Sequence, residues 1–195
     1  MKLADRTIGF ALTGSFCTFA SVLPEIAALS SAGAKVVPIM SETAYSTDTR
    51  FGTAAGFRDK IEEITGREII CTVAAAEPIG PKNLLDALII APCTGNTLGK
   101  LANGITDSSV TMAAKASLRN ENPLIIAVST NDGLGNSARN IGTLLNSRNV
   151  YFVPFTQDDP VKKCNSLVAR MELIVPAVEA AMEGRQMQPV LYREK

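Results

Sequence analysis

The stretch IIAPCTGNTLGKLANGITDSSVTMAAKA, residues 89–116, changes from a continuously apolar run to small and polar residues within a few positions. Its apolar part belongs to DALIIAP at 86–92, which has the composition of a buried parallel strand. Two helical patterns follow, near 95–103 and 108–120. The stretch therefore predicts a buried strand that passes through a polar loop directly into a helix.

The same alternation of strand and helix extends in both directions from this stretch. We expect further strands at 7–13, 35–41, 67–73, 123–129 and 149–155, and further helices at 17–33, 53–66, 137–147 and 164–183. Pro38 places the second strand at a sheet edge or at a bulge. This order predicts an α/β fold, namely a doubly wound, mainly parallel sheet with helices on both faces. We expect one domain over residues 1–183 and a C-terminal tail over 184–195.

Composition excludes several classes of function. Lys+Arg and Asp+Glu number 19 each, and no basic block occurs, so we expect no nucleic-acid partner. No apolar run approaches about 18 residues, and Asp5 and Arg6 interrupt any export signal, so we expect a cytoplasmic protein without membrane contact. The chain contains no His and no CxxC pair, which excludes a catalytic triad, an imidazole base and a zinc site. We expect no metal and four reduced, mostly buried cysteines.

Small, hydroxylic and amide side chains follow the ends of the predicted strands. The segments are Thr13–Ser15, Ser41–Thr43, Cys93–Thr97, Ser129–Gly133 and Thr156–Asp159. In parallel α/β sheets, ligands bind outside the carboxyl ends of the strands, so these segments predict one shared crevice. Such a rim suits a phosphate held by helix N-termini and hydroxyl groups beside a flat heterocycle. The same residue types are also good helix caps and turn formers, which leaves a purely structural interpretation open.

Two nucleotide-binding motifs can be tested directly. No G-x-x-x-x-G-K-[ST] segment occurs, so a P-loop is excluded. GLGNSA at 133–138 matches G-x-G-x-x-A, but it begins well beyond the strand end at Val128, whereas the dinucleotide fingerprint needs its first glycine tight against the strand. We therefore prefer an extended loop facing the substrate to a dinucleotide site.

The segment from Pro92 onward resembles the flavin-contacting segment of the flavoprotein family that includes the flavin-containing cysteine decarboxylases. The family pattern is roughly P-A-[ST]-A-N-T followed by K-x-A-x-G-[IL]-[AT]-D, and the matching residues are Pro92, Asn96, Thr97, Lys100, Ala102, Gly104, Ile105 and Asp107. ALTGS at 11–15 and the hydroxyl of Ser41 match as well. The resemblance implies FMN as cofactor, bound by Gly14, Ser15, Ser41, Pro92, Thr94, Asn96, Thr97 and Ser129. Asn96 would supply an amide to the flavin edge, and Gly14 and Ser15 would meet the phosphate.

Further segments narrow the resemblance to one subunit of a two-subunit enzyme that makes the pyridine dicarboxylate of bacterial endospores. They are TRFG, AEPIGPKNLLDALIIAP, VSTNDGLG, NVYFVPFTQDDP and NSLVARMEL. This implies oxidation of a dihydropyridine dicarboxylate together with a partner subunit that carries NADP. A dicarboxylate calls for cations, and the candidates are Arg50, Arg139 and, more weakly, Lys100. We predict Arg50 and Asn131 as the catalytic residues, although a single cation of this kind is more often a solvated surface charge.

The chain departs from the decarboxylases in two respects. They use a histidine base, and they carry a P-x-M-N segment of which only Asn131 remains here. Cysteine decarboxylation is therefore not expected, but a non-catalytic partner protein with an empty pocket and a different FMN enzyme stay open. The resemblance also implies a homo-oligomer, a trimer or a multiple of it, for which SSVTMAAKASL at 108–118 could form an interface. Alternatively, Val110, Ala113, Ala114 and Leu118 simply pack on the sheet.

Overall fold

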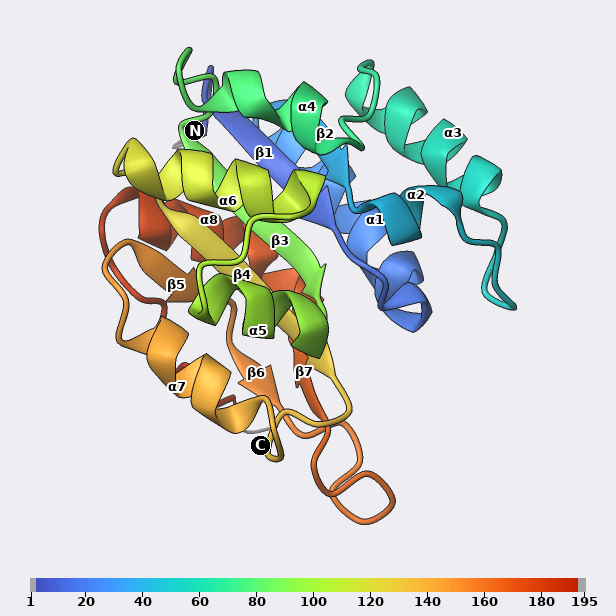
Figure 1. Ribbon diagram of the computed structural model, residues 1–195, viewed down its shortest axis with the longest axis vertical. Helices are drawn as coiled ribbons and strands as arrows, with labels where there is room; N and C mark the ends of the chain where they lie inside the picture. Colours follow the sequence, from blue (N-terminus) through green and yellow to red (C-terminus); the bar gives the residue numbers. More distant parts are fainter. Residues whose placement is uncertain (1–2, 193–195) are drawn as a thin grey trace.

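The computed structural model describes residues 3–192, and its elements alternate between strand and helix (Figure 1). The strands are β1 Thr7–Leu12, β2 Lys35–Met40, β3 Ala87–Cys93, β4 Leu124–Thr130, β5 Val150–Phe152, β6 Phe155–Thr156 and β7 Leu167–Ala169. The α-helices are α1 Phe19–Ser31, α2 Glu42–Ser46, α3 Ala54–Thr65, α4 Val73–Ala76, α5 Gly95–Ala102, α6 Ser109–Arg119, α7 Ala138–Leu145 and α8 Ile174–Met182. Short 3-10 turns lie at Phe16–Thr18, Glu77–Ile79 and Met171–Leu173.

Five strands form the parallel part of the sheet, in the order β2-β1-β3-β4-β5. The order of the strands reverses between β1 and β3, which is where ligands bind in doubly wound sheets. Pro38 lies in β2 at the end of this order, so its prediction as an edge residue is confirmed. The predicted α/β class with a mainly parallel sheet is likewise confirmed.

Helices cover both faces of the sheet. In Figure 1, α4, α5, α6 and α7 lie in front of it, whereas α1 and α8 lie behind. The core is made by β3, which is buried along its whole length, and by β4, which is buried except at Thr130. Each fully buried Leu or Ile of these strands stabilises the fold by about 1.5–3 kcal/mol relative to exposure. Continuous apolar runs of this kind are expected for strands covered on both faces.

The last part of the chain departs from two sequence predictions. The strand predicted at 149–155 is divided into β5 and β6, and Pro154, which has no N–H to donate to a sheet, lies between them. The helix predicted at 164–183 is wrong at its start, because Leu167–Ala169 forms β7. This strand pairs antiparallel with the last two residues of β4 and with β6. Short apolar runs do not distinguish strand from helix, and here distant pairing decides.

Other differences are smaller. The strand predicted at 67–73 is reduced to one bridge between Ile39 and Ile70, and the short helices α2 and α4 were not expected. Val110, Ala113 and Ala114 of α6 are fully buried within the chain, which confirms that they pack on its own core. No helix in the described part of the chain has the length and apolar character needed to cross a membrane.

The cysteines are more exposed than the sequence analysis expects. All four are free thiols, but Cys17 and Cys164 are exposed and Cys71 is half-buried, whereas Cys93 is buried in β3. The expectation of mostly buried thiols is therefore wrong. Cys17 and Cys164 lie in a helical turn and a loop outside the core, where an apolar side chain gains little from burial.

The segment after α8 contacts the sheet. The side-chain amide of Gln186 accepts a hydrogen bond from the N–H of Phe152 and donates one to its carbonyl oxygen, at 2.7 Å each. Leu191 bridges Phe155 in parallel orientation. Residues 193–195 of the predicted tail lie outside the described residues.

Candidate functional site

The carboxyl ends of β1, β3 and β4 open into a crevice of about 820 Å³, called here the large crevice. Its lining comes from residues 14–18, 94–96, 129–132 and 166–168, together with Thr49, Phe51, Asp158 and Lys163. The volume lies in the range of small-molecule and cofactor sites. Four of the five strand-end segments that the sequence predicts therefore meet in one place.

One end of the large crevice is formed by hydroxyl groups. The Oγ of Ser15 lies 2.7 Å from the Oγ of Ser129, and the Oγ1 of Thr18 lies 3.1 Å from the first and 3.3 Å from the second. We call these three residues the hydroxyl cluster. Within the described residues, the backbone N–H groups of Phe16 and Cys17 form no hydrogen bond, as is usual for the first residues of a helical turn. Hydroxyl groups and free N–H groups together offer several neutral donors for an anion.

The loops after β1 and β3 are tied to each other. The hydroxyl of Thr13 donates to the carbonyl oxygen of Pro92 at 2.7 Å and accepts from the N–H of Thr94 at 3.1 Å. Pro92 also lies where the pairing of β3 with β4 shifts register, between Ile90 and Cys93. Proline has no N–H to donate to a neighbouring strand, which explains why the pairing of the two strands is irregular at this position. The result is that Thr94 caps α5 at the edge of the crevice, accepting from the N–H of Thr97 at 3.3 Å.

A second network packs against the start of α5. The carboxylate of Asp132 accepts hydrogen bonds from the hydroxyls of Thr130 at 2.5 Å and of Ser137 at 2.9 Å. A Cβ on Gly95 would lie only 2.7–2.8 Å from oxygen atoms of these three residues, so the network leaves room for glycine alone. The Asp132 carboxylate thus lies at a helix N-terminus, where the helix dipole stabilises negative charge.

Another wall of the large crevice comes from the segment between β6 and β7. There the ammonium group of Lys163 lies 3.0 Å from a carboxylate oxygen of Asp158. Partial burial acts to raise the pKa of Asp158, but hydrogen bonds from Lys163 and Ser166 and the charge of Lys163 outweigh it, so this pKa is lowered. The hydrogen bond to Asp158 and the charge of that carboxylate raise the pKa of Lys163. Both groups are therefore charged at neutral pH.

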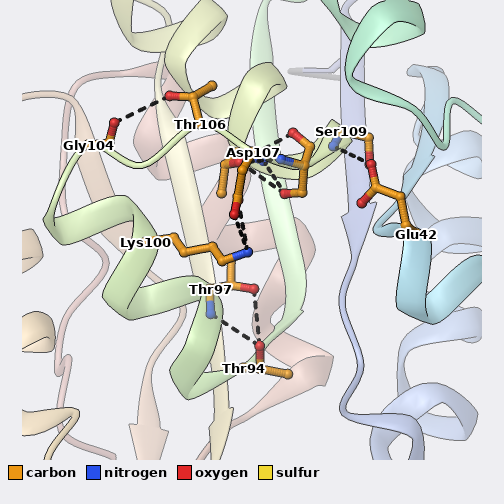
Figure 2. Close-up of polar contacts among 10 residues, drawn as sticks. Glu42, Thr94, Thr97, Lys100, Gly104, Thr106, Asp107 and Ser109 are labelled. Carbon is orange, nitrogen blue, oxygen red and sulfur yellow. Dashed lines mark hydrogen bonds and ion pairs between the residues drawn. The ribbon is translucent and has the colours of Figure 1, made fainter.

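A smaller pocket of about 280 Å³ adjoins the large crevice and shares Gly14, Thr94 and Asn96 with it. Figure 2 shows the polar contacts around this small pocket. Lys100 forms an ion pair with Asp107 at 2.8 Å, and a carboxylate oxygen of Glu42 accepts from the N–H of Ser109 at the start of α6. The cation and the helix N-terminus in the small pocket therefore already have carboxylate partners within the chain.

The predicted cofactor residues are distributed over these two spaces. Ser15 and Ser129 line the large crevice, Ser41 and Thr97 line the small pocket, and Gly14, Thr94 and Asn96 line both. Pro92 lies behind them, in the buried part of β3. The structure thus brings seven of the eight to the surface of these two adjoining spaces, five of them to the large crevice.

The residues predicted to act in catalysis or to bind the substrate carboxylates do not all line the large crevice. Asn131 lines the large crevice, but Arg50 does not; its guanidinium lies over the ring of Phe51, 4.9 Å from the ring centre. Arg139 lines an outer hollow of about 450 Å³ that shares Gly95, Asn96 and Asp132 with the large crevice. Lys100 lines that hollow and the small pocket. Sequence reasoning missed Lys163, although the charged cluster DDPVKK directly after a strand end was a signal for it.

Comparison with known proteins places the chain in a family. The model of the Flavoprotein family matches residues 1–182, so the chain belongs to that family. More narrowly, the chain is 49% identical over 190 residues to the B subunit of dipicolinate synthase from Bacillus subtilis strain 168, covering 97% of this chain and 95% of that one. It is also 48% identical to the B subunit of dipicolinate synthase from Bacillus halodurans C, whose crystal structure superposes over the full length of both chains with a TM-score of 0.92. The FMN-dependent cysteine decarboxylase TvaF is more distant, with 28% identity over 72% of this chain and 85% of its own and a TM-score of 0.54.

The residues present fit a flavin mononucleotide. The hydroxyl cluster and the free N–H groups of the β1–α1 loop offer neutral donors to a phosphate. Phe16, Phe51, Leu167 and Val168 give the same crevice apolar surface for a flat ring. A Cβ added at Gly14 would have only ordinary contacts, 3.7 Å to Phe16 and 3.8 Å to Thr43, so the loop there is open to a ligand.

Proposed function

We propose that this chain is the B-type subunit of a dipicolinate synthase, which binds FMN and, with the A subunit of that enzyme, oxidises dihydrodipicolinate to dipicolinate. The observation that carries the proposal is the large crevice at the strand ends, in a chain about half identical to two proteins of that name. Hydroxyl groups and apolar side chains both line it, which suits the phosphate and the flat ring of FMN.

Each cofactor residue has a role in this proposal. The hydroxyl cluster and the N–H groups of Phe16 and Cys17 hold the phosphate. Because Gly14 has no side chain, the ribityl chain of FMN can approach the protein backbone there. Ser41 and Thr97 face the ribityl hydroxyls from the small pocket. Asn96 donates its amide to the edge of the ring, where Thr94 and the buried Pro92 fix the loop that carries it.

The reaction needs positioning more than acid–base catalysis. Dihydrodipicolinate loses one hydride and one proton and becomes an aromatic pyridine. FMN supplies a two-electron acceptor when bound, and NADP on the A subunit would be the second acceptor. This chain contributes orientation through Asn131 and partial exclusion of water through Phe16 and Phe51. We also propose a homo-oligomer, a trimer or a multiple of it, which light scattering on the purified chain would test.

The test is reconstitution of the purified chain with FMN, with and without the A subunit. We expect a yellow complex with a perturbed flavin spectrum, and formation of dipicolinate from dihydrodipicolinate when both subunits are present. Turnover at the same rate in the absence of this chain would refute a catalytic role for it. A colourless chain that stimulates the A subunit without binding FMN would instead support the non-catalytic alternative.

A further inference from the structure

We propose that Lys163 binds one carboxylate of the substrate and so determines the preference of the crevice for a carboxylate ligand. The inference rests on the proposed function and adds to it the residue that recognises the substrate charge. Among the residues that the structure describes, Lys163 is the one cation that lines the large crevice. The guanidinium of Arg50 lies over Phe51, and Arg139 and Lys100 line other hollows.

The backbone around Lys163 is held in place by local hydrogen bonds. Its N–H donates to the carbonyl oxygen of Asp159 at 2.8 Å, and its own carbonyl oxygen accepts from the N–H of Ser166 at 2.9 Å. The side-chain amide of Gln157 donates to the carbonyl oxygen of Cys164 at 2.8 Å. The segment also contacts the loop after β4, where the N–H of Leu134 donates to the carbonyl oxygen of Asn165 at 3.0 Å. These hydrogen bonds hold the segment that carries Lys163 in place at the wall of the crevice.

The ammonium group of Lys163 has capacity for a second carboxylate. In the described part of the chain, this group contacts Asp158 alone, at 3.0 Å. An ammonium group has three N–H donors, so two are left for a ligand. The side chain is 57% exposed, which leaves it accessible from the crevice. Asp158 thus orients the ammonium group without using all of its donors.

The remaining carboxylates do not prevent anion binding at Lys163. Asp132 also lines the crevice, but two hydroxyls donate to it and it lies at the N-terminus of α5. Its charge is therefore partly compensated within the chain. Asp159 lies close to Lys163 in sequence, and its side chain accepts from the N–H of Lys162 at 2.9 Å. A dicarboxylate would thus find its positive partner at the β6–β7 wall.

The test compares Lys163→Met with Lys162→Met, a neighbouring lysine that is exposed and does not line the crevice. We measure binding of dipicolinate and of its uncharged diamide, pyridine-2,6-dicarboxamide, to the FMN-loaded chain by calorimetry, and KM for dihydrodipicolinate with the A subunit. Loss of one charged hydrogen-bonding partner should weaken dipicolinate binding and raise KM by roughly 10- to 100-fold. Binding of the diamide should fall much less, and FMN affinity should stay within about 2-fold. Lys163→Arg should restore part of the preference for the carboxylate.

The outcomes separate this inference from the proposed function. If the wild-type pair oxidises dihydrodipicolinate but Lys163→Met and Lys162→Met behave alike, Lys163 does not recognise the substrate. Equal weakening of dipicolinate and its uncharged diamide would also overturn the inference, because it indicates a structural effect on the wall. If the wild-type pair neither turns over dihydrodipicolinate nor binds dipicolinate, the proposed function fails, and this inference fails with it.

Discussion

Replacing Gly95 with alanine should displace the Asp132 network at the edge of the large crevice. The new Cβ would lie 2.7 Å from the hydroxyl oxygen of Thr130 and 2.8 Å from the nearest oxygens of Asp132 and Ser137. Ordinary contacts are about 3.5–4.0 Å, so these atoms must move by nearly 1 Å. They are not free to do so independently, because two hydrogen bonds of 2.5 and 2.9 Å join them.

The magnitude follows from two opposing effects. Overpacking of this kind costs about 1–3 kcal/mol, and the better helix propensity of alanine offsets up to about 1 kcal/mol. We expect a net loss of about 1–2 kcal/mol in the free energy of unfolding. For a chain of this size, that corresponds to a decrease in Tm of roughly 2–8 °C. FMN affinity should decrease as well, because the same network fixes the loop that carries Asn131.

Urea and thermal unfolding followed by circular dichroism measure this effect, and Gly99→Ala is the matched control. Gly99 lies in the same helix, and a Cβ there would meet only the side-chain nitrogen of Asn140 at 3.5 Å. Gly99→Ala should be neutral or stabilising by up to about 1 kcal/mol. If Gly95→Ala is as stable as Gly99→Ala and binds FMN equally well, the proposed packing of Asp132 against α5 is wrong.

Three further predictions concern the site. Asn96→Asp should weaken FMN binding by about 10-fold or more in a flavin titration, because a donor is lost and a negative charge is added; wild-type affinity would contradict the placement of the ring. Burial raises the pKa of the Cys93 thiol, so a thiol reagent at neutral pH should modify Cys93 only after unfolding. The exposed Cys17 and Cys164 should react rapidly. FMN should slow the reaction of Cys17, because this residue lines the large crevice. The lowered pKa of Asp158 means that its contribution to stability is present above the unfolded-state value near 3.8 and is lost as the pH falls through the lower folded-state value. Asp158→Asn should therefore reduce the dependence of stability on pH below about 4, measured by urea unfolding at several pH values, and an unchanged slope would contradict the ion pair with Lys163.

The sequence predicted the parallel sheet well because its strands are marked locally. DALIIAP and PLIIAVS are continuously apolar, and each is followed by small polar residues that start a turn. Those polar segments also predicted where the crevice lies, since all parallel strands end at the same edge. The pattern does not predict β7, because Leu167–Ala169 is extended through its pairing with distant Ser129 and Thr130 of β4 and with β6.

The same difficulty limited the prediction of the site's charges. Arg50 is a candidate from sequence because a dicarboxylate calls for a guanidinium, but its side chain stacks on the ring of Phe51. Lys163 directly precedes the segment 164–183, which the sequence pattern predicts as helix. Only the antiparallel pair β6–β7 brings it to the crevice. Residues placed by nonlocal pairing are therefore the ones that periodicity alone does not locate.

The two sides of the large crevice differ in how they can change. One side is formed by the ends of core strands, where any alteration disturbs the packing of the sheet. The other is a surface excursion between two short antiparallel strands, and lengthening such a segment carries only a modest entropic cost. Insertions or deletions between Thr156 and Leu167 would thus reshape the large crevice for a different ligand and leave the hydroxyl cluster, the proposed phosphate site, intact.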